Sequence, residues 1–132
     1  MTAEDLAQAA LAARLNAYAP FSNFRVGAAL ETAGGKVYSG CNVENATYGL
    51  TVCAERVALW KAISEGERAF IRIAVASDSL KPITPCGACR QLLWEFGGDL
   101  EVILATPQGQ LESRRLKDLL PEAFDRDALN KF

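Results

Sequence analysis

Residues 53–56 read CAER and residues 85–91 read PCGACRQ, and the rest of the chain can be placed around these two short stretches. Thr51 is a good N-cap residue, so a helix is expected to begin directly after it. Thr84 followed by Pro85 gives the same start signal, with proline at the first helical position. The two stretches are therefore predicted to form the first turns of two helices.

The cysteines of these two stretches indicate a metal site. Cys86 and Cys89 are three residues apart, so they share one face of a helical first turn. Cys53 takes the same position on the other helix, and the positive end of a helix favours thiolate over thiol. Three thiolates leave one coordination position open, which is typical of a catalytic rather than a structural zinc site. We therefore predict zinc held by Cys53, Cys86 and Cys89.

The composition excludes several other classes of protein. The chain has 132 residues, which suffices for one compact domain but not for two, so residues 1–132 are expected to form a single domain. The net charge is −2 and no Lys/Arg cluster is present, which argues against nucleic-acid binding. No signal-like N-terminus and no membrane-spanning apolar stretch is found, so we expect a cytoplasmic protein, in which free cysteines are more often ligands or catalytic groups than disulfides.

The chain contains no histidine, and this absence narrows the chemistry. It excludes Ser-His and Cys-His catalysis and any His-ligated metal, so a general acid–base must be Glu, Asp, Lys, Tyr or Cys. Glu55 lies two residues after Cys53, where it would point near the metal without having to ligate it. We predict that Glu55 takes a proton from a zinc-bound water and passes it on.

A zinc ion with three thiolates carries a net charge of about −1, which weakens its pull on a bound water. Positive groups near the sulfurs must offset this charge if hydroxide is to form near neutral pH. The two helix N-termini help, and so would a guanidinium that donates to the sulfurs. Arg56 is the first candidate for this charge compensation and Arg90 is the second.

The order of elements predicts an α/β fold: a three-layer α/β/α arrangement around a mixed, mostly five-stranded sheet. The strands at 70–76 and 100–105 are expected to form a right-handed parallel pair, so that both cysteine helices begin at the same edge of the sheet. The remaining expected elements are a helix within 3–17, a hairpin of strands 25–31 and 36–41 joined by TAGG, and a short edge strand at 111–115.

The two cysteine stretches also resemble the signature of zinc-dependent nucleobase deaminases, H-x-E followed by P-C-x-x-C, with cysteine in place of the histidine. Other parts of the chain carry the same resemblance: FRVGAAL at 24–30, GCNVENA at 40–46 and LPEAF at 120–124. Nearly end to end, the chain resembles the cytidine deaminases of the small, homotetrameric, three-cysteine zinc type.

The resemblance implies hydrolytic deamination of cytidine and deoxycytidine to uridine and deoxyuridine plus ammonia, a reaction of pyrimidine salvage. In that family the residues matching Asn42 and Glu44 grip the ribose hydroxyls, and the ring matching Phe24 packs on the base. The aromatic residue matching Phe124 reaches a neighbouring subunit's pocket, so the family implies a homotetramer with shared active sites. The helical first turn adds that the backbone amide of Ala54 could donate to the base, because it has no helical partner.

Other interpretations of the cysteines remain open. A structural zinc closed by Cys41 would use all four cysteines of the chain but would leave Glu55 without a role. Cys41 is otherwise expected to be a small buried residue at a strand end. A C-x-x-C at a helix start is also the thioredoxin arrangement, although the upstream Cys53 and Glu55 argue against redox chemistry.

Other interpretations of the remaining residues are equally open. Glu44 could be a solvated loop acid, Phe24 a core residue, and Phe124 a residue that only docks the C-terminal tail. A deaminase for a nucleoside-like antibiotic shares the zinc motifs, and a polynucleotide deaminase is disfavoured by the pI of about 5.2. The sequence assigns no role to Tyr48, and it places Trp60 and Trp94 in the core.

Overall fold

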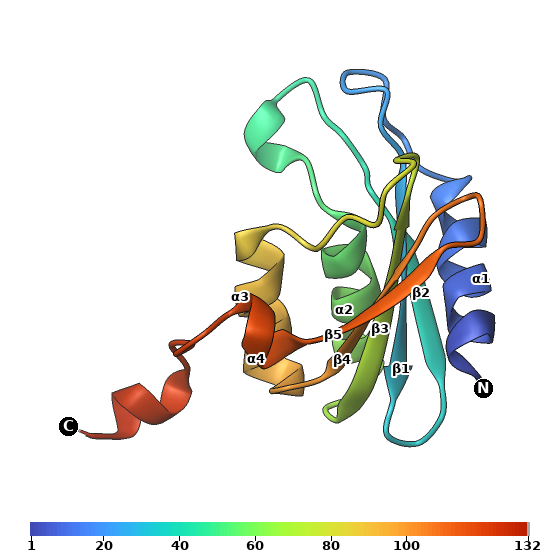
Figure 1. The fold of residues 1–132 in the computed structure, drawn as a ribbon. Coiled ribbons are helices and arrows are strands. Elements are labelled where there is room, and N and C mark those ends of the chain that lie inside the picture. Colours follow the sequence, from blue (N-terminus) through green and yellow to red (C-terminus); the bar gives the residue numbers. More distant parts are fainter. Residues whose placement is uncertain (132) are drawn as a thin grey trace.

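The structure is a computed structural model that describes residues 1–131, and it is organised around one five-stranded sheet (Figure 1). The strand order is β2-β1-β3-β4-β5. Strands β3 and β4 are parallel, and the other neighbouring pairs are antiparallel, so the predicted mixed sheet and its parallel pair are confirmed. The strands are β1 (Val26–Thr32), β2 (Val37–Cys41), β3 (Phe70–Ser77), β4 (Glu101–Ala105) and β5 (Leu111–Arg115).

Helices cover both faces of the sheet, which confirms the three-layer α/β arrangement (Figure 1). Helix α1 (Ala3–Arg14) lies on one face, and α2 (Ala54–Ser64) and α3 (Gly87–Gly97) lie on the other. Among residues 1–131, no helix has the length and apolar character needed to cross a membrane. The remaining elements are the short helix α4 (Leu116–Leu119) and the 3₁₀ helices η1 (Tyr48–Leu50) and η2 (Arg126–Lys131).

Helix α1 is fixed at its start by a capping box and along its length by close packing. The Thr2 hydroxyl accepts from the Asp5 amide at 3.1 Å, while the Asp5 carboxylate accepts from the Thr2 amide at 3.1 Å. Gly27 of β1 lets the helix backbone approach the sheet, because a Cβ there would lie 2.0 Å from the Ala10 carbonyl oxygen. Leu6 and Ala10 are fully buried against this face of the sheet.

Helix α2 is seated in a similar way on the opposite face, and this contact sets the position of the CAER stretch. Ala54, Ala58 and Ala62 recur every four residues and are all buried, which gives α2 a smooth face toward the strands. A Cβ at Gly40 of β2 would lie 2.8 Å from the Ala54 carbonyl oxygen. The first turn of α2 therefore rests directly on β2.

The structure corrects both predicted helix starts by two residues. Cys53 is the N-cap of α2 and Cys86 is the N-cap of α3, each with an extended backbone. The Thr51 hydroxyl instead accepts from the Asn45 amide at 3.1 Å. The Thr84 hydroxyl accepts from Nη2 of Arg90 at 2.7 Å, so both threonines stabilise the loops that precede the helices.

The core prediction for the two tryptophans is half right. Trp94 of α3 packs against the core and donates from Nε1 to the Asp125 carboxylate at 3.3 Å. The prediction that Trp60 is a core residue is wrong, because 51% of its surface is exposed. The alanine face of α2 takes the contact with the sheet, and Trp60 lies outside it.

Candidate metal centre and active site

The cysteines that cap α2 and α3 have free thiol groups at the positive ends of these helices. The carbonyl oxygen of Cys53 accepts the first helical bond, from Val57, at 3.1 Å, and that of Cys86 accepts from Arg90 at 3.0 Å. Neither cysteine side chain makes a capping hydrogen bond, so both sulfurs remain available as ligands. Cys89 lies one turn further along α3 and is fully buried.

The structure brings these three cysteines together, although Cys53 is far from the other two in the sequence. Their Sγ atoms all lie within 4.8 Å of one another. Tetrahedral zinc–sulfur bonds of about 2.3 Å place sulfurs roughly 3.8 Å apart, so small side-chain adjustments would close the site. No histidine or fourth cysteine joins this cluster among the described residues. The donor set fits a soft divalent metal with one open position.

The thiols influence each other strongly. A hydrogen bond from Cys89 lowers the pKa of Cys53 to about 6, with burial opposing and the charge of Arg56 helping. The same hydrogen bond, together with burial and the charge of Glu55, raises the pKa of Cys89. The Cys89 thiol therefore keeps its proton and donates toward the Cys53 sulfur, and a bound metal cation would displace that proton.

The two candidate arginines have different surroundings. The Arg56 side chain lies among the sulfurs: burial lowers its pKa, but interactions with Cys89, Cys53 and Cys86 outweigh burial and raise it. Its Nε atom is buried and has no hydrogen-bond partner within residues 1–131.

Arg90 is directed elsewhere, and its contacts do not support the predicted role in charge compensation. Its Nε donates to the Pro85 carbonyl and its Nη1 to the Leu119 carbonyl, both at 2.7 Å. Its Nη2 donates to the Thr84 hydroxyl, as described above. Arg90 therefore secures the loop in front of Cys86, because its guanidinium is occupied by three oxygen acceptors.

Glu55 is a buried acid in the first turn of α2, with 6% of its surface exposed. Burial, reinforced by the negative charge of Cys53, raises its pKa to about 7, while its own backbone amide and Arg56 act in the opposite direction. A carboxyl group with this pKa can both accept and release a proton at neutral pH. It lines the same pocket as Cys53 and Cys86.

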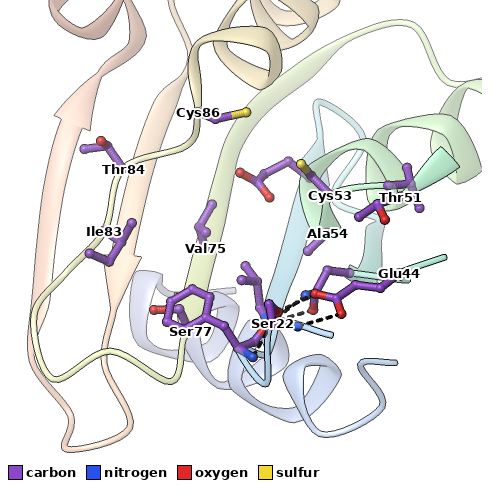
Figure 2. Close-up of a pocket in the computed structure, with 15 residues that line it drawn as sticks. Ser22, Glu44, Thr51, Cys53, Ala54, Val75, Ser77, Ile83, Thr84 and Cys86 are labelled. Atoms are coloured by element: carbon purple, nitrogen blue, oxygen red, sulfur yellow. Dashed lines mark hydrogen bonds between the residues drawn. The ribbon is translucent and has the colours of Figure 1, made fainter. Parts of the chain in front are cut away.

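This pocket has a volume of about 350 Å³, which is within the range of small-molecule sites. Figure 2 shows Cys53 and Cys86 at one end and Glu44 with Ser22 at the other. Of the residues predicted from the sequence, the pocket is lined by Phe24, Asn42, Glu44, Cys53, Ala54, Glu55 and Cys86. Residues separated by more than sixty positions in the chain thus form one site.

Asn42 and Glu44 are both tied to the segment that carries Phe24. The Asn42 side chain accepts from the Val26 amide and donates to the Phe24 carbonyl, both at 2.8 Å. The Glu44 carboxylate accepts from the amides of Phe21 at 2.9 Å and Ser22 at 3.1 Å. Glu44 is therefore an ordered part of the pocket wall rather than a free loop acid.

Phe124 does not line this pocket, and 59% of its surface is exposed. Its carbonyl accepts from Nε2 of Gln91 at 2.6 Å, which fixes the C-terminal segment to α3. In Figure 1 this segment points away from the sheet. Cys41, the other open question, is a half-buried free cysteine outside the metal cluster.

Several pocket residues were not predicted from the sequence. Ser22, Ser77 and Thr84 contribute hydroxyl groups, and Val75 and Ile83 contribute apolar surface. Thr84 stands directly before the PCGACRQ stretch and could have been included on that ground. The others carry no local signal, because only the packing of β3 and two loops brings them to the pocket.

The fold and the site together have the features of a metal-dependent hydrolase: three clustered cysteine sulfurs at two helix N-termini, with one buried carboxyl group beside them in a small-molecule pocket. The comparisons with known proteins give the particular family. Residues 1–106 match the family model described as the cytidine and deoxycytidylate deaminase zinc-binding region. The chain belongs to the cytidine and deoxycytidylate deaminase family.

Individual relatives agree with this assignment. The cytidine deaminase of Halalkalibacterium halodurans is 47% identical over 131 residues, which cover 98% of this chain and 99% of the relative. The crystal structure of cytidine deaminase from Burkholderia pseudomallei is 55% identical, covers 94% of this chain and 100% of that chain, and superposes with a TM-score of 0.90. The blasticidin-S deaminase of Bacillus cereus is 32% identical over 110 residues, covering 77% of this chain and 78% of the relative.

Proposed function

We propose that this protein deaminates cytidine and deoxycytidine by hydrolysis, giving uridine or deoxyuridine and ammonia, as a step in pyrimidine salvage. The observation that carries the proposal is the buried Glu55 beside the three-cysteine cluster, in a pocket whose far end holds Asn42 and Glu44. The names of the relatives support the same substrate class.

The cysteine cluster fits zinc, and Cys53, Cys86 and Cys89 would hold it. Bound zinc would supply a Lewis acid that lowers the pKa of a water molecule in the open position. The family model, which describes a zinc-binding region, supports zinc over other soft metals. Arg56 and the helix N-termini balance the charge of the thiolates.

Glu55 carries the proton through the reaction. Its carboxylate accepts one proton of the attacking water and delivers it to the ring nitrogen of the base. It then accepts the second proton of that water, from the new hydroxyl on the ring carbon, and passes it to the departing amine, which leaves as ammonia while the hydroxyl becomes the carbonyl. The raised pKa of Glu55, about 7, suits a group that must accept and give up a proton in one cycle. Water and cytidine are thereby consumed, and uridine and ammonia are produced.

The other pocket residues bind and orient the nucleoside. The Ala54 amide lies in the first turn of α2, has no helical acceptor, and can donate to the base. Phe24 packs on the base, while Asn42 and Glu44 take the sugar hydroxyls and so select nucleosides over free bases. Removing either polar side chain should raise KM, and should also lower kcat if remote binding energy serves the transition state.

We further propose that the chain acts as a single domain, residues 1–132, and assembles into a homotetramer in the cytoplasm. Several large apolar side chains are exposed on the single chain, including Tyr48, Leu50, Trp60 and Phe124, which supports burial against other copies. Phe124 would then reach a neighbouring subunit's pocket. Sedimentation of the purified protein measures the assembly: a monomer would contradict this part of the proposal.

The test of the proposed activity is the ultraviolet absorbance of cytidine incubated with the zinc-loaded protein. We expect a steady change to the uridine spectrum, and a loss of at least about 100-fold in Glu55→Gln because the general acid–base is removed. Glu95→Gln, an exposed acid on α3, is the matched control and should retain the rate. Turnover of blasticidin S but not of cytidine would instead favour the activity named for the Bacillus cereus relative.

A further inference from the structure

The segment that carries Phe24 is held by a hydroxyl group that neither the metal site nor the proposed proton transfer uses. Ser22 lines the pocket at the end opposite the cysteines, as Figure 2 shows. Its Oγ donates to the Oε2 atom of Glu44 and accepts from the Phe24 amide at 3.1 Å. The Ser22 hydroxyl oxygen thus connects the Glu44 carboxylate to the backbone of Phe24, and both residues line the pocket.

The Glu44 carboxylate is nearly saturated by this segment. A carboxylate offers about four acceptor positions. The amides of Phe21 and Ser22 occupy two of them on Oε1, and the Ser22 hydroxyl occupies one on Oε2. About one position is left for a hydroxyl group of a ligand, so the direction from which that hydroxyl can bind is fixed in advance.

The two hydrogen bonds of the Ser22 hydroxyl, to Glu44 and from the Phe24 amide, are called the Ser22 bridge from here on. The backbone around Ser22 has the shape that this bridge requires. Asn23 adopts φ of 56°, a left-handed conformation that asparagine tolerates, and the chain reverses there. This reversal brings the Phe24 amide back to the oxygen of Ser22. On the outer side, the Phe21 ring meets Tyr48 edge to face, with centroids 6.0 Å apart, so the segment is supported from both sides.

We propose that Ser22 is a positioning residue: its hydroxyl sets the Glu44 carboxylate and the Phe24 ring relative to each other, so that the sugar end and the base end of the pocket are aligned as one unit. This inference rests on the proposed function for the identity of the ligand. The bridge itself does not depend on the proposed function, because its hydrogen bonds are present in the free protein.

The chemistry of the bridge explains why a hydroxyl group is needed. The oxygen must donate and accept at once, and serine provides one donor and two acceptor lone pairs. Alanine would remove both bonds, leave Oε2 of Glu44 free to turn, and release the Phe24 amide. Because Ser22 is an exposed residue, this substitution removes no core contact, and the free energy of unfolding should stay close to that of the wild type.

The kinetic test compares wild type, Ser22→Ala, Glu44→Ala and the double variant in the cytidine assay. We expect Ser22→Ala to raise KM about 5- to 10-fold, the cost of one hydrogen bond, with kcat changed by less than about twofold. In the Glu44→Ala background the same change should raise KM by a smaller factor, because the bond to the carboxylate is already lost and only the bond from the Phe24 amide remains to be removed. Ser64→Ala, an exposed serine near the end of α2, is the matched control.

Two kinetic results would overturn the proposal: an unchanged KM in Ser22→Ala, or an equal change in KM with and without the Glu44 carboxylate. Amide hydrogen exchange tests the bridge independently of any substrate. Ser22→Ala should speed exchange at the amides of Phe21 and Phe24, whereas unchanged exchange at both would contradict the bridge. If the wild type does not deaminate cytidine, the proposed function fails. The exchange measurement still decides whether the Ser22 hydroxyl holds Glu44 and the Phe24 amide together.

Discussion

Replacing Gly40 by alanine should move the metal ligand of α2 without touching the site. A Cβ at this position of β2 would lie 2.6 Å from the Ala58 amide nitrogen and 2.8 Å from the Ala54 carbonyl oxygen. Comfortable Cβ contacts begin near 3.4 Å, so the first turn of α2 must move away from the sheet by roughly 0.6 to 0.8 Å. The atoms in the way are helix backbone and cannot be relieved by a rotamer change.

This displacement has two measurable consequences. Overpacking of this kind costs about 1–3 kcal/mol of the free energy of unfolding. For a domain of this size that lowers Tm by about 4–12 °C. The same movement shifts Cys53 and Glu55 relative to the cysteines of α3, and a misplacement approaching 1 Å can cost about 100-fold in rate. We therefore expect kcat/KM for cytidine to fall about 10- to 100-fold, with weaker zinc binding.

The assay combines thermal unfolding, zinc content per chain by elemental analysis, and cytidine turnover. Gly34→Ala is the matched control, because the nearest atom to a Cβ there is the Thr32 hydroxyl oxygen at 3.8 Å. Its Tm and rate should match the wild type. Wild-type Tm, zinc content and rate in Gly40→Ala would refute the reasoning, and a lowered Tm with full activity would show that the site does not depend on how α2 is seated.

Four further predictions concern charge and metal. Asp78→Asn should cost about 1.5–3 kcal/mol at pH 7, because the carboxylate accepts from the guanidinium groups of Arg14 and Arg25. Burial raises the pKa of Asp78, but these two arginines outweigh it and hold the pKa below its ordinary value of 3.8. The stabilisation is therefore complete above that value and is lost as the pH falls through the folded pKa. The free energies of unfolding of wild type and Asp78→Asn, measured in urea, should converge in acid. A difference that stays constant with pH would contradict this account. Arg56→Ala should keep its Tm within a few degrees yet lose about tenfold or more in kcat, because the charge balance at the thiolates is removed; an unchanged rate would exclude Arg56 from the mechanism. A chelator should abolish turnover and lower Tm, and both should recover when zinc is added. Cys41→Ser should keep both zinc and turnover. Loss of zinc in that variant would instead support a four-cysteine structural site.

The sequence predicted well what depends on neighbours along the chain. The hairpin of β1 and β2 and the position of the cysteines at the starts of α2 and α3 follow from periodicity, turn residues and short spacing. The parallel pair β3 and β4 follows instead from the rule for strand–helix–strand crossovers. The exact caps did not follow, because the Thr51 and Thr84 hydroxyls accept from Asn45 and Arg90, each six residues away, instead of capping the helices.

Contacts over long separations could not be predicted in the same way. The sequence offers Arg56 as the first and Arg90 as the second guanidinium group near the cysteines, but Arg90 donates to the Leu119 carbonyl, 29 residues away. Trp60 has the spacing of a core residue and is nevertheless exposed, because the alanines of α2 occupy the contact with the sheet. Ser22 carries no signal, since its partner Glu44 lies 22 residues further along.

The sequence by itself determined which residues are candidate ligands and which is the candidate acid–base: cysteines at helix starts, one acid two residues after a cysteine, and no histidine to compete. These properties are local, because helix geometry fixes the relation between residues a few positions apart. The tertiary structure decided how these residues are arranged: the sulfurs of Cys53, Cys86 and Cys89 lie within 4.8 Å of one another, Glu55 is buried, and Glu44 lines the far end of the pocket. Such relations depend on how α2 and α3 pack against the sheet, and packing is a property of the whole fold.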